Sequence, residues 1–405
     1  MSLTIMMKTL EEVISGLRKV DSPVRVVCEE SADGLAAGYL LGMLLTGLGK
    51  KFVVAYEDKK QLKNVLKEKY DWFIFVFNEE LNEDARLVRL GVKHGEINAG
   101  VLGINGESLS EVVYGFCARI MDFKKHGWVV VANALPGIKG YASSVLKECM
   151  GEGMINAVNG LRMFNNAKRE LVKEIAYSYD PCLRSVYGDE NKARAFLENI
   201  KISGLEGGKG IIDLSGEEVE RLVSAVLLDM VGIEEGDAFG MIYTANDCDL
   251  LWVKLVVEVC LKQNKHGVAY GFLKGSREDV KQAVEMYDEH AMEMIKALKK
   301  INGSRIEKNY GCFNLGGEFK YGIYDELVRL VVKRKILKLP LVMIIAYAIT
   351  NEVLAYGRVD KEHMGRLVEE LGESGWVKID EEGFFNGEIK NEEGLLKKIE
   401  GWFSS

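Results

Sequence analysis

The chain has 405 residues, of which 48% are hydrophobic, and it carries a formal net charge of -8. This length and composition fit a globular protein of two or three domains. The acidic balance argues against a broad nucleic-acid-binding surface, because neutralising phosphates requires clustered lysine and arginine, although a narrow basic groove stays compatible with it.

No segment predicts a membrane span. The N-terminus lacks the basic segment followed by an apolar core that is typical of a signal peptide. The longest apolar run, which begins at Leu339, is too short to span a bilayer and contains a proline. The cysteines form no C-x-x-C pair, which is typical of buried thiols in a reducing compartment. We therefore expect a soluble intracellular protein, cytoplasmic and nucleoid-associated, or nuclear in a eukaryote.

Apolar runs of strand length alternate with helical patterns in the first third of the chain. The runs that predict strands are 24–28, 51–57, 71–77 and 128–134, with a weaker one at 97–104. The segments that predict helices are 35–48, 59–70, 83–92 and 108–123. Strands that are apolar on both faces and separated by helices indicate a parallel, doubly wound α/β domain with helices on each side. Ligands of such sheets bind beyond the carboxyl ends of the strands.

Beyond Pro136 the pattern becomes mostly helical. Ser215 and Glu218 form a capping-box pattern ahead of an apolar helix, and further helices are predicted at 249–263 and 276–301. A helix at 324–337 and a hairpin at 341–359 around Asn351 and Glu352 then predict a small C-terminal α/β domain. We divide the chain into an α/β domain (1–175), a helical connector (176–301) and a C-terminal α/β domain (302–405).

The loop after the first strand, "CEESADG", is the best candidate for a site. Its polar side chains include Glu29, Ser31 and Asp33. Asp33 followed by Gly34 at a helix start fits an N-cap with a glycine turn as well as it fits a cation ligand.

The other strand-end loops offer fewer ligands. Asn78 follows the third strand where a carboxylate would be needed, and the stretch at Gly103 and the loop ending in Tyr141 contain no carboxylate or imidazole. The five histidines are isolated from one another and from the cysteines. Two cations require several converging ligands, so we expect no metal and no cofactor.

Taken in order, these loops resemble the motifs of the DHH phosphoesterase superfamily, which includes the RecJ exonucleases. The first motif of the family is H-x-D-x-D-G before a helix of small residues. Its four fixed positions are occupied here by Glu29, Ser31, Asp33 and Gly34, and only Asp33 and Gly34 are the residue types that the motif requires. The resemblance implies that residues 1–175 form a DHH-like domain whose metal ligands are largely replaced.

The later motifs follow the same trend. Asn78 stands at the aspartate of the second motif, and Gly103 begins "GING" where D-H-H is expected. Tyr141 replaces the acid that ends A-x-x-G-x-x-G-D, which "ALPGIKGY" resembles. Near the C-terminus, "VLAYGRV" is similar to the S-x-R stretch of the DHH-associated domain, with Arg358 at the arginine place, while the usual G-G-H is not found.

In the non-catalytic branch of the family, several metal ligands are lost together while the fold is conserved. This branch includes the Cdc subunit of the eukaryotic replicative helicase, which bridges the MCM ring and the GINS complex, and archaeal RecJ-like proteins play a similar part. The resemblance implies a catalytically inactive replication scaffold with GINS and MCM as partners and at most weak binding of single-stranded DNA.

Two alternatives stay open. One is a metal-dependent single-strand exonuclease or small phosphodiesterase with a rearranged site that uses Glu29, Glu30 and Asp33. The other is a regulator that binds a phosphate ligand without hydrolysis through Arg358 and the backbone amides near Gly34.

Overall fold

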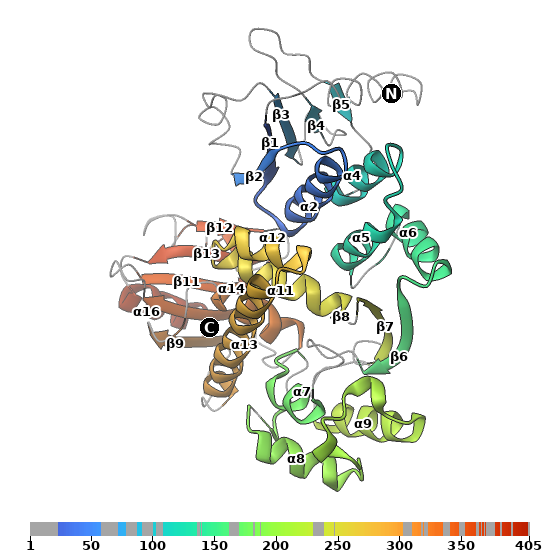
Figure 1. Cartoon of the computed structure of the whole chain (residues 1–405). Coiled ribbons are helices and arrows are strands. Elements are labelled where there is room, and N and C mark those ends of the chain that lie inside the picture. Colours follow the sequence, from blue (N-terminus) through green and yellow to red (C-terminus); the bar gives the residue numbers. More distant parts are fainter. Residues whose placement is uncertain are drawn as a thin grey trace. The chain divides into compact units, whose positions relative to one another are not determined.

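The computed structural model divides into two compact units. Unit 1 comprises Met1–Val158 and Ile242–Tyr287, and unit 2 comprises Asn159–Met241 and Asp288–Ser405. The chain passes between the units in β6 (Asn156–Leu161), β7 (Phe239–Ala245) and α13 (Arg277–Asn302) (Figure 1). The division into three domains at residues 175 and 301 stays a prediction. The structure describes residues 23–57, 72–77, 87–90, 100–102, 108–135, 138, 140–161, 170–180, 183–186, 188–229, 239–246, 248–302, 310–316, 319, 323–334, 341–347, 353–361, 364–365, 367, 369, 377–380, 383–389 and 392–403.

The first sheet belongs to unit 1 and has a parallel centre. Its order is β2-β1-β3-β4-β5, and β1 pairs in parallel with both β2 and β3. The strands are β1 (Val24–Glu29), β2 (Phe52–Glu57), β3 (Trp72–Phe77), β4 (Leu87–Leu90) and β5 (Gly100–Leu102). The α/β class with parallel strands is thus confirmed.

Two predicted elements of this unit were wrong. The segment predicted as a helix at 83–92 contains β4, which pairs antiparallel with β3 and β5. The apolar run predicted as a strand at 128–134 is helix α5 (Gly127–Ala134). Residues 129–132 are buried, so this helix shows no polar face that would distinguish it from a buried strand.

Helix α2 (Ala32–Gly47) contacts β1, β2 and β3, and several other helices of unit 1 pack against it (Figure 1). Those that contact α2 are α4 (Leu109–Ala118), α5, α11 (Leu250–Lys262) and α12 (His266–Lys274), while α6 (Gly140–Gly151) packs on α5. The predicted helix at 59–70 lies outside the described residues, so helices on the second face of the sheet stay a prediction. No helix in the described part of the chain is long and apolar enough to cross a bilayer.

Three glycines of α2, spaced four residues apart, let its neighbours approach closely. A Cβ on Gly38 would lie 2.8 Å from the Tyr56 hydroxyl, and a Cβ on Gly42 would lie 2.0 Å from the Tyr270 hydroxyl. At Gly34 the conflict is with backbone, since the Cβ would lie 2.1 Å from the carbonyl oxygen of Glu29. The small residues of this helix therefore serve its packing against the sheet and α12.

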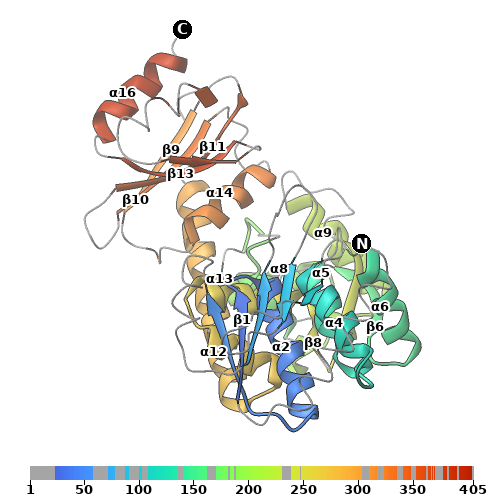
Figure 2. The ribbon, with the colours of Figure 1, turned by 90° about the horizontal axis from the view of Figure 1, so that it is seen from above.

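Unit 2 contains short helices and the C-terminal sheet, whose order is β12-β13-β11-β10-β9. Helices α14 and α16 lie on opposite faces of this sheet (Figure 2). The predicted hairpin is confirmed, because β10 and β11 pair antiparallel from Leu341↔Val359 to Tyr347↔Val353, and its turn lies outside the described residues. The elements are α7 (Leu171–Tyr177), α8 (Glu190–Asn199), α9 (Gly216–Asp229), β9 (Tyr310–Gly316), α14 (Tyr324–Lys333), β10 (Leu341–Tyr347), β11 (Val353–Val359), β12 (Val377–Ile379), β13 (Phe384–Ile389) and α16 (Glu392–Phe403). A three-stranded sheet, β6-β7-β8, includes the short strand β8 (Cys248–Asp249).

A buried ion pair fastens α14 within unit 2. Arg334, just after α14, donates from Nε to Oδ1 of Asp180, and both residues are 5% exposed. Nearby, Glu326 on α14 accepts hydrogen bonds from the Tyr179 hydroxyl at 3.0 Å and from Nε2 of His290 at 2.9 Å. These contacts tie the segment after α7 to both α13 and α14.

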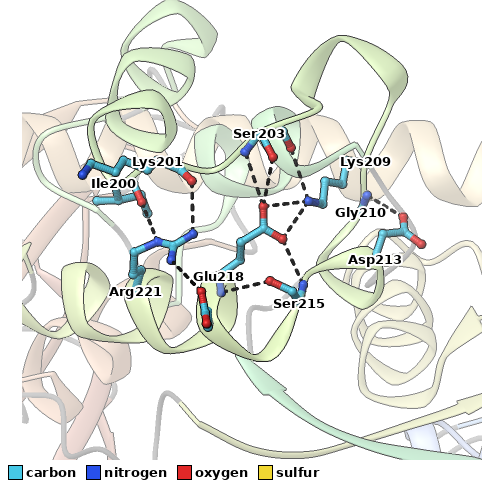
Figure 3. Close-up of polar contacts among 10 residues, drawn as sticks. Ile200, Lys201, Ser203, Lys209, Gly210, Asp213, Ser215, Glu218 and Arg221 are labelled. Carbon is cyan, nitrogen blue, oxygen red and sulfur yellow. Dashed lines mark hydrogen bonds and ion pairs between the residues drawn. The ribbon is translucent and has the colours of Figure 1, made fainter.

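The predicted capping box of α9 is confirmed. Ser215 N donates to Oε2 of Glu218 at 2.9 Å, and Glu218 N donates to Oγ of Ser215 at 3.3 Å. Figure 3 shows that the Glu218 carboxylate also accepts hydrogen bonds from Lys209, whose Nζ lies 2.8 Å from each carboxylate oxygen. The chain before α9 is further held by Arg221, which donates to the carbonyl oxygens of residues 200 and 201.

We predict that this network resists acid. The hydrogen bond from Lys209, helped by the backbone amide of Ser215, lowers the pKa of Glu218 from 4.5 to about 2. A carboxyl whose pKa is lower in the folded state stabilises fully above its unfolded pKa and loses that contribution as pH falls through the folded pKa. Between about pH 4.5 and 2 the wild type should therefore lose about 2 kcal/mol that Glu218→Gln does not lose.

Urea denaturation at several pH values in this range measures the difference. Glu217→Gln is the matched control, because the neighbouring Glu217 side chain is 91% exposed. Parallel pH profiles for the wild type and Glu218→Gln would contradict the prediction.

Candidate functional site

The loop between β1 and α2 is organised by Ser31. Ser31 is the N-cap of α2, with extended backbone, and its Oγ accepts a hydrogen bond from Gly34 N at 3.0 Å. The cap considered for Asp33 thus belongs to Ser31. Because Gly34 N already has this acceptor, it is not a free donor for a phosphate group.

Asp33 accepts four hydrogen bonds from protein donors. Its Oδ2 accepts from Leu109 N at 2.6 Å. Its Oδ1 accepts from Ser110 N at 2.9 Å, from Ser110 Oγ at 2.7 Å and from Asn133 Nδ2 at 2.7 Å. Asp33 stands in the first turn of α2, but the helix whose N-terminus it caps is α4.

The first turn of α4 is completed by its own N-cap. Ser108 accepts from Glu111 N at 3.2 Å, so the amides of residues 109, 110 and 111 all have side-chain acceptors. The carboxylate of Asp33 also complements the partial positive charge of this helix end. The N-terminus of α4 therefore has no unused amide in this turn for an external anion.

Asn133, at the end of α5, is a site residue that the sequence interpretation missed. Its Nδ2 also lies 3.1 Å from Ser110 Oγ, and its carbonyl oxygen accepts from Lys254 Nζ of α11 at 3.1 Å. Lys254 Nζ reaches the Leu135 carbonyl as well, at 2.6 Å. Asn133 directly precedes the stretch "ALPGIKGY", and as an amide it is neither a carboxylate nor an imidazole, the ligand types on which the prediction depended.

His266 was also missed. This first residue of α12 lies with Nε2 at 3.0 Å from Oε1 of Glu30, and its ring stacks on that of Tyr56 at 5.5 Å between centroids. An imidazole therefore stands beside the loop that follows β1. Only the fold could reveal it, because Glu30 and His266 are 236 residues apart in the sequence.

The structure brings together only part of the predicted set. Glu29 ends β1 and lies in register with Glu57 at the end of β2, next to Ser31, Asp33 and Gly34. Asn78 and Gly103 lie outside the described residues.

The last two predicted positions lie on other elements of the fold. Tyr141 is in the first turn of α6, and its side chain is not among those described. Arg358 is half-buried on β11 of unit 2, in register with Val342 and Phe384.

Cys28 is a packing residue. It is fully buried at the end of β1, and burial raises the pKa of its thiol well above the ordinary value. A thiol held neutral in this way is a poor nucleophile and a poor metal ligand.

No family model and no curated protein sequence matches the chain. Solved structures do match over its whole length. CDC45 from Entamoeba histolytica aligns with a TM-score of 0.63 and 11% identity, covering 98% of this chain and 99% of that chain. The exonuclease RecJ bound to manganese aligns with a TM-score of 0.52 and 10% identity, covering 97% and 92%. RecJ of Thermus thermophilus in complex with Mn²⁺ aligns with a TM-score of 0.50 and 10% identity, covering 99% of this chain and 54% of that chain.

Both of these RecJ structures contain manganese. A divalent cation needs several oxygen or nitrogen ligands that converge on one point. Within the described ranges, no group of three or more His, Cys, Asp or Glu side chains is placed to hold a metal ion. Asp33 faces amide and hydroxyl donors, and Glu30 faces His266. The described side chains of this loop therefore do not fit a metal centre.

Proposed function

We propose that this chain, which has a RecJ-like DHH fold related to that of CDC45, is a non-catalytic DNA-replication factor that links the GINS complex to the MCM helicase. The observation that carries the proposal is the Asp33 carboxylate, which is occupied by four protein donors. A phosphoesterase of this fold would need such a carboxylate for its cation.

The charge of the chain also supports protein partners over nucleic acid. With a formal net charge of -8, the chain has little to gain from a phosphate backbone. Binding energy in a scaffold comes from a few apolar or aromatic anchors, whose desolvation depends only weakly on salt. Among the described large apolar side chains, Leu228 on α9 is the most exposed, at 88%.

We predict a complex with GINS from the same organism that survives moderate salt. Size-exclusion chromatography of the two purified components at low and moderate salt should show co-elution under both conditions. Leu228→Ser is expected to weaken this complex, whereas Glu217→Gln, an exposed change on the same helix, should not. Separate elution at both salt concentrations would contradict the scaffold.

The alternative is a metal-dependent exonuclease or small phosphodiesterase with a rearranged site. The pair formed by Glu30 and His266 favours it, because it brings an imidazole to the strand ends. The two functions separate in one assay, in which a labelled single-stranded oligonucleotide is incubated with the chain and Mn²⁺. We expect no degradation; cleavage that disappears in both Asp33→Asn and His266→Ala would establish the nuclease instead.

A further inference from the structure

We infer that the Asp33 carboxylate links α2, α4 and α5 through hydrogen bonds and without a bridging cation, so that unit 1 is stable without metal. The inference deepens the proposed function, since a chain that does not hydrolyse phosphoesters has no use for the ion. It concerns Asp33, Ser110 and Asn133, from three different helices.

The first step is the acceptor capacity of the carboxylate. Two carboxylate oxygens offer about four lone-pair sites. Asp33 receives four hydrogen bonds, at 2.6, 2.7, 2.7 and 2.9 Å. Three of the four fall on Oδ1, so a cation could bind that oxygen only by displacing one of its donors, which would leave a partly buried N–H or O–H without an acceptor.

The second step is the positive charge that the carboxylate needs. Two of its donors are amides of the first turn of α4, a ten-residue helix whose N-terminus carries a partial positive charge. Asn133 adds the polar N–H group of an amide. A helix end and a neutral amide thus stand where a cation would otherwise balance Asp33.

The third step is closure of the network. Ser110 Oγ donates to Asp33 and lies 3.1 Å from Asn133 Nδ2, which also donates to Asp33. The three side chains form a triangle in which every contact is a hydrogen bond. The carbonyl oxygen of Asn133 is held in turn by Lys254 of α11, so the fastening continues into a fourth helix.

Thermal unfolding of the full chain, with MnCl₂ or with EDTA, tests the inference. The wild-type Tm should be the same in both. Asn133→Ala should lower the Tm by about 3 to 6 °C, because Asp33 and Ser110 lose a hydrogen-bond donor. The Tm of this variant should also be the same with MnCl₂ as with EDTA.

The decisive variant is Asn133→Asp. It places a second carboxylate against Asp33, so its Tm in EDTA should fall below that of Asn133→Ala. Mn²⁺ should restore stability in this variant, because two facing carboxylates supply the ligands that the wild type lacks. Asn191→Asp adds the same charge at an exposed position of α8 and should neither lose stability nor respond to Mn²⁺.

Two results together would overturn the inference. The wild-type Tm would rise with Mn²⁺, and calorimetry would detect Mn²⁺ binding to the wild type that Asp33→Asn abolishes. If Asp33→Asn does not fold, Asn133→Ala replaces it, and loss of the Mn²⁺ response in that variant would be equally decisive. This failure is distinct from that of the proposed function. Separate elution from GINS would refute the scaffold while leaving a metal-independent fastening in place.

Discussion

Arg334→Met is expected to lower the free energy of unfolding of unit 2 by about 3 to 5 kcal/mol. The Asp180 carboxylate is 5% exposed, and removing the guanidinium takes away its buried ion-pair partner in a medium that solvates charge poorly. Lys333 Nζ lies 3.7 Å from Asp180 Oδ2, but the Lys333 side chain is 57% exposed, so water screens its attraction for the carboxylate. Urea denaturation followed by circular dichroism measures the loss.

Lys333→Met is the matched control, since it removes a solvent-exposed cation that lies near the same carboxylate. It should cost less than about 1 kcal/mol. The double variant Asp180→Leu with Arg334→Met should recover much of the stability, because neither charge of this pair is then left buried without the other. Similar losses for Arg334→Met and Lys333→Met would refute this account of the ion pair.

Gly34→Ala is expected to destabilise unit 1 by about 3 kcal/mol. The added Cβ would lie 2.1 Å from the carbonyl oxygen of Glu29, and neither β1 nor α2 can move away without disturbing the sheet. Gly267→Ala on α12 is the control, because a Cβ there meets nothing within 4 Å. Alanine should stabilise that helix by about 0.5 to 1 kcal/mol. Thermal denaturation should thus move in opposite directions for the two variants, and a common direction would contradict the packing argument.

The sequence was informative where a local pattern determines the structure. Strands β1 to β3 were predicted because runs that are apolar on both faces are typical of a parallel sheet. The capping box of Ser215 and Glu218 and the hairpin of β10 and β11 depend on neighbours in the chain, and both were correct.

The errors arose where tertiary contacts decide. Three consecutive valines favour a strand locally, yet residues 129–131 form part of α5, which packs among α2, α4, α6 and α11. Strand β4 carries the pattern of a helix face and becomes a strand only through pairing with β3 and β5.

At the candidate site, the sequence located the loop but not the partners. The positions of Ser31, Asp33 and Gly34 followed from one short stretch. That Asp33 caps α4 instead of α2 depends on Leu109 and Ser110, and that Asn133 joins them depends on a residue 100 positions further along. Such partners leave no local signal, because nothing in the spacing of these residues requires them to meet.

The discontinuity of unit 1 has a consequence for synthesis on the ribosome. Residues 1–158 emerge first, but α11 and α12, which fill the space beside α2, lie beyond residue 242. Until they arrive, Gly42 lacks the Tyr270 ring that covers it, and the end of α5 lacks Lys254. The nascent N-terminal segment therefore exposes apolar surface while all of 159–241 is translated, which is the situation in which chaperones bind and aggregation begins. This unit can complete its folding only after residue 287 has emerged, even though its first strand is among the earliest parts made.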